Sequence, residues 1–297
     1  MSGDKGFFLT VMLRHFPRYE QWLPKENVDT EPARPLVSKD AVGFISGFLG
    51  GVGDTICNFP PYGLHLRLQD NKSINPFKNP QFYRPRELYR GTAAYSVIIP
   101  ITCIADGFSE YLKRHFTMDA FMATFISGMT AAFFVTAPTS NTIVYQQKNA
   151  VSAKVAIRQI MAKYGAYRFT TGMSLYMLRE GIYSVSVFSA KPWLQTQNAY
   201  FQNDIVASVL VGIVATILSQ PCDTIATYMV GADKRMSPLK AIPAMYHGYE
   251  HDGTRSEGGL RRFYRGFLLR GYAVVAGIYV MSKVSNATKR AFNVNNE

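Results

Sequence analysis

Catalytic motifs and clustered cysteines are missing from this chain of 297 residues. Its three cysteines, Cys57, Cys103 and Cys222, lie far apart in or beside apolar stretches, which predicts buried thiols rather than disulfides or a zinc site. The sequence has no phosphate-binding glycine loop and no nucleophile elbow. His247 and His251 have helical spacing, but their polar, glycine-rich surroundings favour a solvated loop over a metal site. We therefore expect no enzyme activity, no catalytic residue and no metal.

Charge is absent from two long stretches, Ala120–Gln147 and Ile205–Cys222. A helix that spans a membrane needs about 20 apolar residues, so both stretches are expected to span one. The mean hydropathy of the whole chain is only −0.03. Long polar connections lower this average, and a helix that faces a cavity or a neighbour needs only one apolar face. Hydropathy alone therefore undercounts the membrane helices.

The formal net charge is +12, and its Lys and Arg residues are scattered through the connections. No basic helix or aromatic-basic stripe typical of a nucleic-acid groove is present, so membrane lipids are the expected partners, with no nucleic acid. No cleavable signal peptide is evident. Gly6–Leu23 could form an amphipathic surface helix, and Pro24–Asp40 is typical of an extended arm. A partner contact and a tail without contacts are equally open for this arm.

Three tripeptides recur at similar spacing: Asn58-Phe59-Pro60, Thr136-Ala137-Pro138 and Ser219-Gln220-Pro221. Each closes an apolar run rich in glycine or alanine, after which the chain becomes amphipathic. The pattern predicts a threefold repeat with a helix kink at each proline, because proline removes an intrahelical hydrogen bond.

Six long helices in three pairs follow from this repeat. Small residues such as Gly47 and Gly51 in the first helix, and Gly128 in the third, are expected to let helices approach closely in a bilayer. A short amphipathic helix is expected at Val151–Tyr164, with Val155, Ile157, Ile160 and Met161 on one side. The expected long helices are Asp40–Gln69, Ala93–Lys113, Phe121–Gln147, Ser174–Trp193, Asp204–Met229 and Leu268–Lys289.

The runs that follow the three prolines resemble the signature of the mitochondrial carrier family, Pro-x-acid-x-x-base, with most of its charges missing. Tyr89-Arg90-Gly91 and Tyr264-Arg265-Gly266 match the aromatic-basic-glycine motif of the same family, and Thr170-Thr171-Gly172 is an eroded copy. The resemblance covers about Asp40–Arg290. It implies an all-α membrane protein with six transmembrane helices in three pseudo-threefold repeats, in the mitochondrial inner membrane. The corresponding division is an N-terminal arm (1–39) and repeats at 40–117, 118–200 and 201–297.

The aromatic-basic-glycine motif also implies bound lipid. A glycine that opens a helix leaves backbone N–H groups free for an anion, and a neighbouring arginine adds positive charge. The resemblance implies cardiolipin at Arg90-Gly91 and Arg265-Gly266, with little or none beside Gly172. Ordinary helix starts are the alternative explanation.

The family closes its central cavity at two ends with salt bridges, and both sets are eroded. The matrix-side acid positions hold Tyr62, Ser140 and Asp223, and the base positions hold His65, Ile143 and Ala226. Because a buried acid in a membrane is costly unless paired, His65 is the expected partner of Asp223. At the other end, the family has an acid followed three residues later by a base near the end of each even-numbered helix. Glu110 and Lys113 retain both charges of this pair in the first repeat, whereas the third repeat has the base Lys289 but no acid. A gate needs a difference in interaction energy between its two states. Because few of these salt bridges are left, little of that energy remains.

The substrate contacts of the family lie about seven residues beyond each helix-opening glycine. The second repeat has Arg179 there, followed by Glu180, an arrangement similar to that in carriers of amino and keto acids. The first has Ile98, or Val97 if Pro100 shifts the register, and the third has Ala273. Only one helix thus offers polar groups, although Arg270 could add a second cation. An internal structural ion pair is the other interpretation of Arg179 and Glu180.

Two functional hypotheses follow. The first is a carrier-fold protein that has lost transport and acts as a structural or accessory subunit of a larger inner-membrane complex, for example in the respiratory chain. The second is an active carrier of a small anion, keto acid or amino acid.

Overall fold

The computed structural model describes residues 39–69, 80–89, 92–96, 98–149, 151–232, 236–251, 254–256 and 258–292. The chain divides into two units, Met1–Leu36 and Val37–Glu297, and all described residues belong to the second. The expected helix Gly6–Leu23, most of the arm, Arg90, Gly91 and Val97 lie outside these residues. Within them the chain is helical, and the only β-pairing is an isolated bridge between Tyr249 and Arg255.

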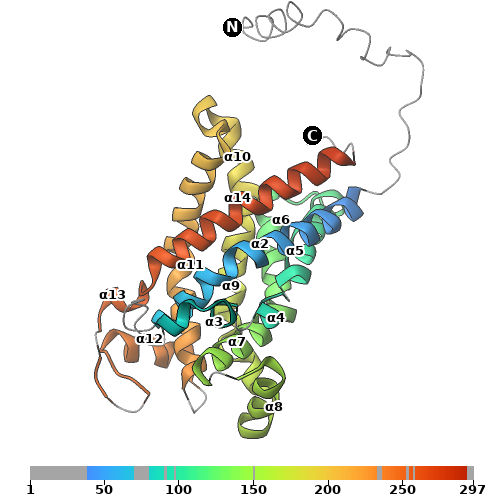
Figure 1. Ribbon diagram of the computed structural model, residues 1–297. Helices are drawn as coiled ribbons and strands as arrows, with labels where there is room; N and C mark the ends of the chain where they lie inside the picture. Colours follow the sequence, from blue (N-terminus) through green and yellow to red (C-terminus); the bar gives the residue numbers. More distant parts are fainter. Residues whose placement is uncertain are drawn as a thin grey trace, which may run out of the picture. The chain divides into compact units, whose positions relative to one another are not determined.

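The described part of the chain contains thirteen α-helices, three of which have only four residues (Figure 1). They are α2 (Lys39–Gln69), α3 (Pro85–Leu88), α4 (Thr92–Tyr95), α5 (Ile98–His115), α6 (Ala120–Ala131), α7 (Ala137–Asn149), α8 (Ala153–Tyr164), α9 (Met173–Val185), α10 (Lys191–Gln197), α11 (Asp204–Gly231), α12 (Pro238–Tyr246), α13 (Leu260–Phe263) and α14 (Phe267–Ala291). Two π-helical segments, Ala132–Thr136 and Ser186–Ala190, join α6 to α7 and α9 to α10.

The long helices contact one another in a closed order. Helix α2 packs between α5 and α14, α5 also contacts α6, and α6 packs on α9. Helix α9 contacts α11, which in turn packs on α14. Side chains that point inward from these helices therefore converge on one interior, which is where the candidate site lies.

Four segments of the described chain are long and apolar enough to cross a membrane: Ala41–His65, Ala120–Asn149, Asp204–Gly231 and Leu260–Ala291. The chain is thus an all-α protein with the features of a multi-pass membrane protein. Helices α5 and α9 are not among the four. Helix α5 carries two acids and two bases within its 18 residues, and α9 carries the charged residues Arg179 and Glu180.

Small residues set the distance between α2 and α5, as the sequence predicts. A Cβ added to Gly47 would lie 2.5 Å from the backbone oxygen of Thr102, and one on Gly51 would lie 2.8 Å from the Cα of Ile99. On α6, a Cβ at Gly128 would lie 2.6 Å from the backbone oxygen of Glu180 in α9. The two helix pairs are therefore packed backbone to backbone, an approach that only glycine permits.

The expected first even helix, Ala93–Lys113, is wrong at its start. The structure has a short helix α4 that ends at Tyr95, and α5 begins at Ile98. Proline fits best in the first turn of a helix, where its missing N–H has no intrahelical partner, and Pro100 is the third residue of α5.

The connection after α7 also differs from the expectation. Helix α8 begins at Ala153 rather than Val151, and its inward face is formed by Ala156 and Ile160. Val155, Ile157 and Met161 are exposed, so of the four apolar residues expected on one face only Ile160 is buried. Ala156 and Ile160 are four residues apart and therefore lie on the same face of α8, which packs on α7.

Candidate functional site

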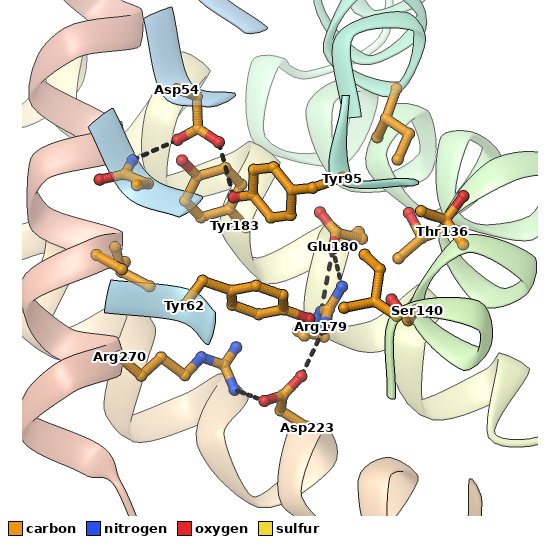
Figure 2. A pocket seen from close by; sticks show the side chains of 16 residues that line it. Asp54, Tyr62, Tyr95, Thr136, Ser140, Arg179, Glu180, Tyr183, Asp223 and Arg270 are labelled. Atoms are coloured by element: carbon orange, nitrogen blue, oxygen red, sulfur yellow. Dashed lines mark hydrogen bonds and ion pairs between the residues drawn. The ribbon is translucent and has the colours of Figure 1, made fainter. Parts of the chain in front are cut away.

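Asp223 is the centre of a buried ion network. It lies in α11, two residues after Pro221, and is 1% exposed. Its carboxylate accepts a hydrogen bond from Nη1 of Arg179 at 2.5 Å, and Nη1 of Arg270 lies 3.2 Å away (Figure 2). Nε2 of His65 lies 3.1 Å from its Oδ2 atom. One carboxylate therefore joins cationic side chains of α9 and α14 and a histidine of α2.

The partners of Asp223 are themselves satisfied. Arg179 also donates to Glu180, with its Nη2 and Nε atoms 2.5 and 3.0 Å from Oε1. Arg270 donates to the backbone and hydroxyl oxygens of Ser219 at 3.3 and 2.9 Å. The other nitrogen of His65, Nδ1, lies 3.2 Å from the backbone oxygen of Gly266. A buried charge is costly unless it is paired and hydrogen-bonded, and here both arginines and both carboxylates meet that condition.

The structure brings together more polar groups than the sequence analysis expected. The pair of His65 and Asp223 is present, and Arg179 is paired with Glu180 as the structural interpretation requires. The expectation that only one helix offers polar groups is wrong, because Arg179 of α9, Arg270 of α14 and Asp223 of α11 converge. Counting residues from a helix-opening glycine cannot show how far a long side chain reaches across the interior.

A small cavity of about 90 Å³ borders this network. Arg179, Glu180, Asp223 and Arg270 form its charged wall, and Ala273 adds an apolar surface. Typical small-molecule sites enclose about 300–1,000 Å³. This space therefore suits only very small ligands or a few water molecules. The side chain of Ile98 is not described.

The remaining signature positions line or border the same space without charge. Tyr62, Ser140 and Ile143 line the cavity. Ala226 is fully buried, and a Cβ on Gly172 would lie 3.1 Å from its Cβ. These positions thus fill the interior with neutral side chains where the family places salt bridges.

Among the polar residues that line the cavity, Asp54, Tyr95 and Tyr183 were missed in the sequence analysis. Tyr95 donates a hydrogen bond to Oδ2 of Asp54 at 3.0 Å, and Asn58 donates to Oδ1 at 2.5 Å. A single acid within the apolar, glycine-rich stretch before Pro60 was the available signal. It was overlooked because it has no counterpart in the other repeats.

A second ion network lies near the C-terminal ends of α5 and α14. Lys113 donates to Glu110 at 3.2 Å, and Nζ of Lys289 lies 3.8 Å from the same carboxylate. Lys289 also lies 3.7 Å from Asp106, which accepts a hydrogen bond from the hydroxyl of Ser46. The acid-base step expected at Glu110 and Lys113 is therefore present, and Lys289 extends it to a second helix.

The expected lipid positions coincide with helix starts. Gly172 and Gly266 are the N-caps of α9 and α14 and have left-handed backbones, with φ of 74° and 79°. The backbone oxygen of Arg265 accepts a hydrogen bond from Gln220 at 3.0 Å. A cleft of about 640 Å³ lies beside Gly172, between the starts of α9 and α12. Only glycine adopts these φ values readily, which explains its recurrence at the helix openings.

The two histidines in the connection after α12 are exposed, and one of them contacts an aromatic ring. The ring of His251 stacks on Tyr228 with 4.1 Å between ring centroids. Desolvation of the ring, together with the charge of Lys148, lowers the pKa of His251. Within the described residues no three His, Cys, Asp or Glu side chains are grouped as metal ligands.

No protein-family model matches this chain, and a search of curated proteins also finds no match. Its placement among known proteins therefore depends on the motifs and the site geometry.

Proposed function

We propose that this chain is a mitochondrial carrier-fold protein that has lost transport and acts as a structural or accessory subunit of a larger inner-membrane complex. Several observations support a six-helix fold with three repeats. Pro60, Pro138 and Pro221 lie inside α2, α7 and α11, and Gly172 and Gly266 open α9 and α14. The contacts among α2, α5, α6, α9, α11 and α14 close on themselves, as six helices around an axis require.

The pairing of Asp223 with both cavity arginines carries the functional proposal. An arginine that binds a solute carboxylate must be free to do so. Here Arg179 and Arg270 are held by the chain's own carboxylate, and Arg179 also binds Glu180. Asp223 thus occupies the place that a solute anion would take.

Displacing Asp223 would carry a large cost. The displaced carboxylate would remain buried in a membrane-spanning helix, where the ring of His65 lies 3.1 Å from it. Removing one partner from a buried ion network typically costs 3–5 kcal/mol. A cavity of about 90 Å³ offers a nucleotide or keto acid few new contacts to offset this cost.

Bound cardiolipin belongs to the same proposal. Gly266 and the neighbouring Arg265 open α14 in the manner that favours a phosphate group, and Arg90-Gly91 would supply the matching site. The cleft beside Gly172 has room for a lipid head group but no arginine next to the glycine. Equally strong density for a two-phosphate lipid at Arg90-Gly91, Gly172 and Arg265-Gly266 would contradict the role that we assign to the arginines.

Two experiments test the proposal. Protein reconstituted into liposomes should show no exchange above background for nucleotides, phosphate, keto acids or basic amino acids. On native electrophoresis of solubilised mitochondria it should migrate with a respiratory or ATP-synthase complex. Migration as a free small protein, together with saturable uptake of any of these solutes, would overturn the proposal.

The convergence of Arg179 and Arg270 favours one alternative, an active carrier of a small carboxylate. In that case the solute would exchange with Asp223 on the two arginines, and Arg179→Ala would abolish uptake. Under the subunit proposal the same substitution affects only stability, so the Arg179→Ala variant distinguishes the two functions.

A further inference from the structure

Asp54 is a buried acid whose charge is not balanced by the ion network around Asp223. It lies on α2 within the segment Ala41–His65 and is 2% exposed. Its two carboxylate oxygens accept hydrogen bonds from Asn58 and Tyr95. Both donors are neutral, and no cation lies within ion-pair distance of Asp54 among the described residues. An ionised group inside a membrane-spanning segment usually marks a functional site.

The two hydrogen bonds place a neutral polar group on each carboxylate oxygen. The amide nitrogen of Asn58 can only donate, and Tyr95 is placed to donate to the other oxygen. Gly277 of α14 makes room for this arrangement, because a Cβ there would lie 2.7 Å from Oδ1 of Asp54 and 2.5 Å from the hydroxyl of Tyr183. The acid is thus held by hydrogen bonds from its own helix and from α4 and is packed against α14, with no cation beside it among the described residues.

Aromatic rings surround the space in front of this acid. Tyr62, Tyr95 and Tyr183 line the cavity, and the rings of Tyr62 and Tyr95 are 5.1 Å apart at their centroids. In Figure 2 the rings of Tyr95 and Tyr183 lie just below Asp54, and Arg270 lies farther down, beyond Tyr62. Aromatic faces attract cations, and a carboxylate beside such rings is a common way to bind an ammonium group.

An unpartnered group on the same cavity also indicates a polar occupant. The hydroxyl of Thr136 is buried and has no hydrogen-bond partner in the described part of the chain, although it lines the cavity. Buried hydroxyl groups rarely stay unpaired, and a polar ligand or a water molecule held with it would satisfy this one.

We propose that the Asp54 end of the cavity binds a small ammonium ion, either ammonium itself or methylammonium. The carboxylate supplies the opposite charge, and the tyrosine rings supply a cation-binding surface. The accessible space of about 90 Å³ is well below the ~300–1,000 Å³ of typical small-molecule sites, so only the smallest amines fit. A metal ion fits less well, because Asp54 is not part of any group of metal ligands in the described residues. This site does not depend on the proposed subunit role.

The test is thermal unfolding of the purified full-length protein with added salts. Methylammonium chloride should raise the unfolding midpoint by ~2–4 °C at saturation, whereas equal concentrations of sodium chloride or tetraethylammonium chloride should not. In Asp54→Asn the shift should be lost. The matched control is Asp204→Asn, which removes an acid that is paired with Lys191 and Lys283 and does not line the cavity. It should keep the full shift.

An equal shift with all three salts, no shift with methylammonium, or a full shift in Asp54→Asn would each overturn the proposal. If Asp54→Asn does not fold, the unchanged protein is tested with cations of increasing size, and the order of stabilisation decides whether the site exists. Stabilisation by ammonium and methylammonium but not by tetraethylammonium supports the site, and any other order contradicts it. None of these outcomes bears on liposome transport, so the two proposals can fail separately.

Discussion

The two ion networks of this protein use similar chemistry in different surroundings. Around Asp223 the acid is 1% exposed and contacts cationic groups of α9 and α14 and the histidine of α2. Around Glu110 the acid's side chain is 22% exposed, and that of Lys289 is 18% exposed. The first network lies near the C-terminal end of α2, and the second near its N-terminal end, where Ser46 contacts Asp106.

The difference teaches how burial decides what an ion pair contributes. Exposed pairs contribute about 0–1 kcal/mol because water screens them. Breaking a buried pair costs about 3–5 kcal/mol because the remaining charge has no water to solvate it. We therefore expect the Asp223 network to be essential to the fold and the contacts of the partly exposed Glu110 to contribute little.

The largest expected effect is that of Asp223→Ala. This substitution removes a carboxylate partner from both Arg179 and Arg270, and both arginines are buried. The free energy of unfolding should fall by about 3–5 kcal/mol, measured by thermal or denaturant unfolding in detergent. A loss below about 1 kcal/mol would mean that the two networks are equivalent.

Close packing should matter more than charge where α2 meets α5. Gly47→Ala places a Cβ 2.5 Å from the backbone oxygen of Thr102, and overpacking of this kind costs about 1–3 kcal/mol. The matched control is Gly50→Ala, whose new Cβ would lie at an ordinary 3.7 Å from Met281. Equal unfolding midpoints for the two variants would contradict the close approach of α2 and α5.

Removing the exposed acid should have a small effect. Glu110→Gln weakens the contacts with Lys113 and Lys289 and should lower the free energy of unfolding by at most about 1 kcal/mol. The same unfolding assay measures it beside Asp223→Ala. A loss as large as that of the Asp223 variant would show that the exposed network is also structural.

The smallest expected effect is the change that added salt makes to the stability loss of Glu110→Gln. At 1 M salt the Debye length is about 3 Å, so the difference between Glu110→Gln and the unchanged protein should vanish. The cost of Asp223→Ala should persist, because salt does not screen buried charges as strongly. Repeating both unfolding series at low and high salt checks this, and parallel losses in the two variants would be the contrary result.

The sequence predicted the parts of the site that depend on short spacing along one helix. Counting from Pro221 identified Asp223, and counting from Pro60 identified His65, because two and five residues fix a direction on a helix. The structure places these side chains 3.1 Å apart. The helical class and the apolar segments at Ala120–Asn149 and Asp204–Gly231 followed from composition alone.

The parts that failed depend on distances between helices. Arg270 reaches Asp223 and Lys289 reaches Glu110 from other helices, and a flexible side chain leaves no spacing in the sequence for such contacts. Asp54 was missed because it has no counterpart at the same position in the other repeats. The three-repeat arrangement and the lipid sites stay predictions.

The π-helical segment Ala132–Thr136 has a consequence for how the chain is counted. A π turn holds one residue more than an α turn, and each residue of an α-helix advances by about 100°. The extra residue rotates the side chains of α6 by about 100° about the helix axis, compared with an α-helix that continues without a π turn to Pro138. Helices α2 and α11, in contrast, run through their prolines as uninterrupted α-helices. Residues counted backward from the three prolines consequently correspond in sequence but face different directions. Deleting one residue from the segment would turn the whole of α6, including Gly128, away from its present neighbour.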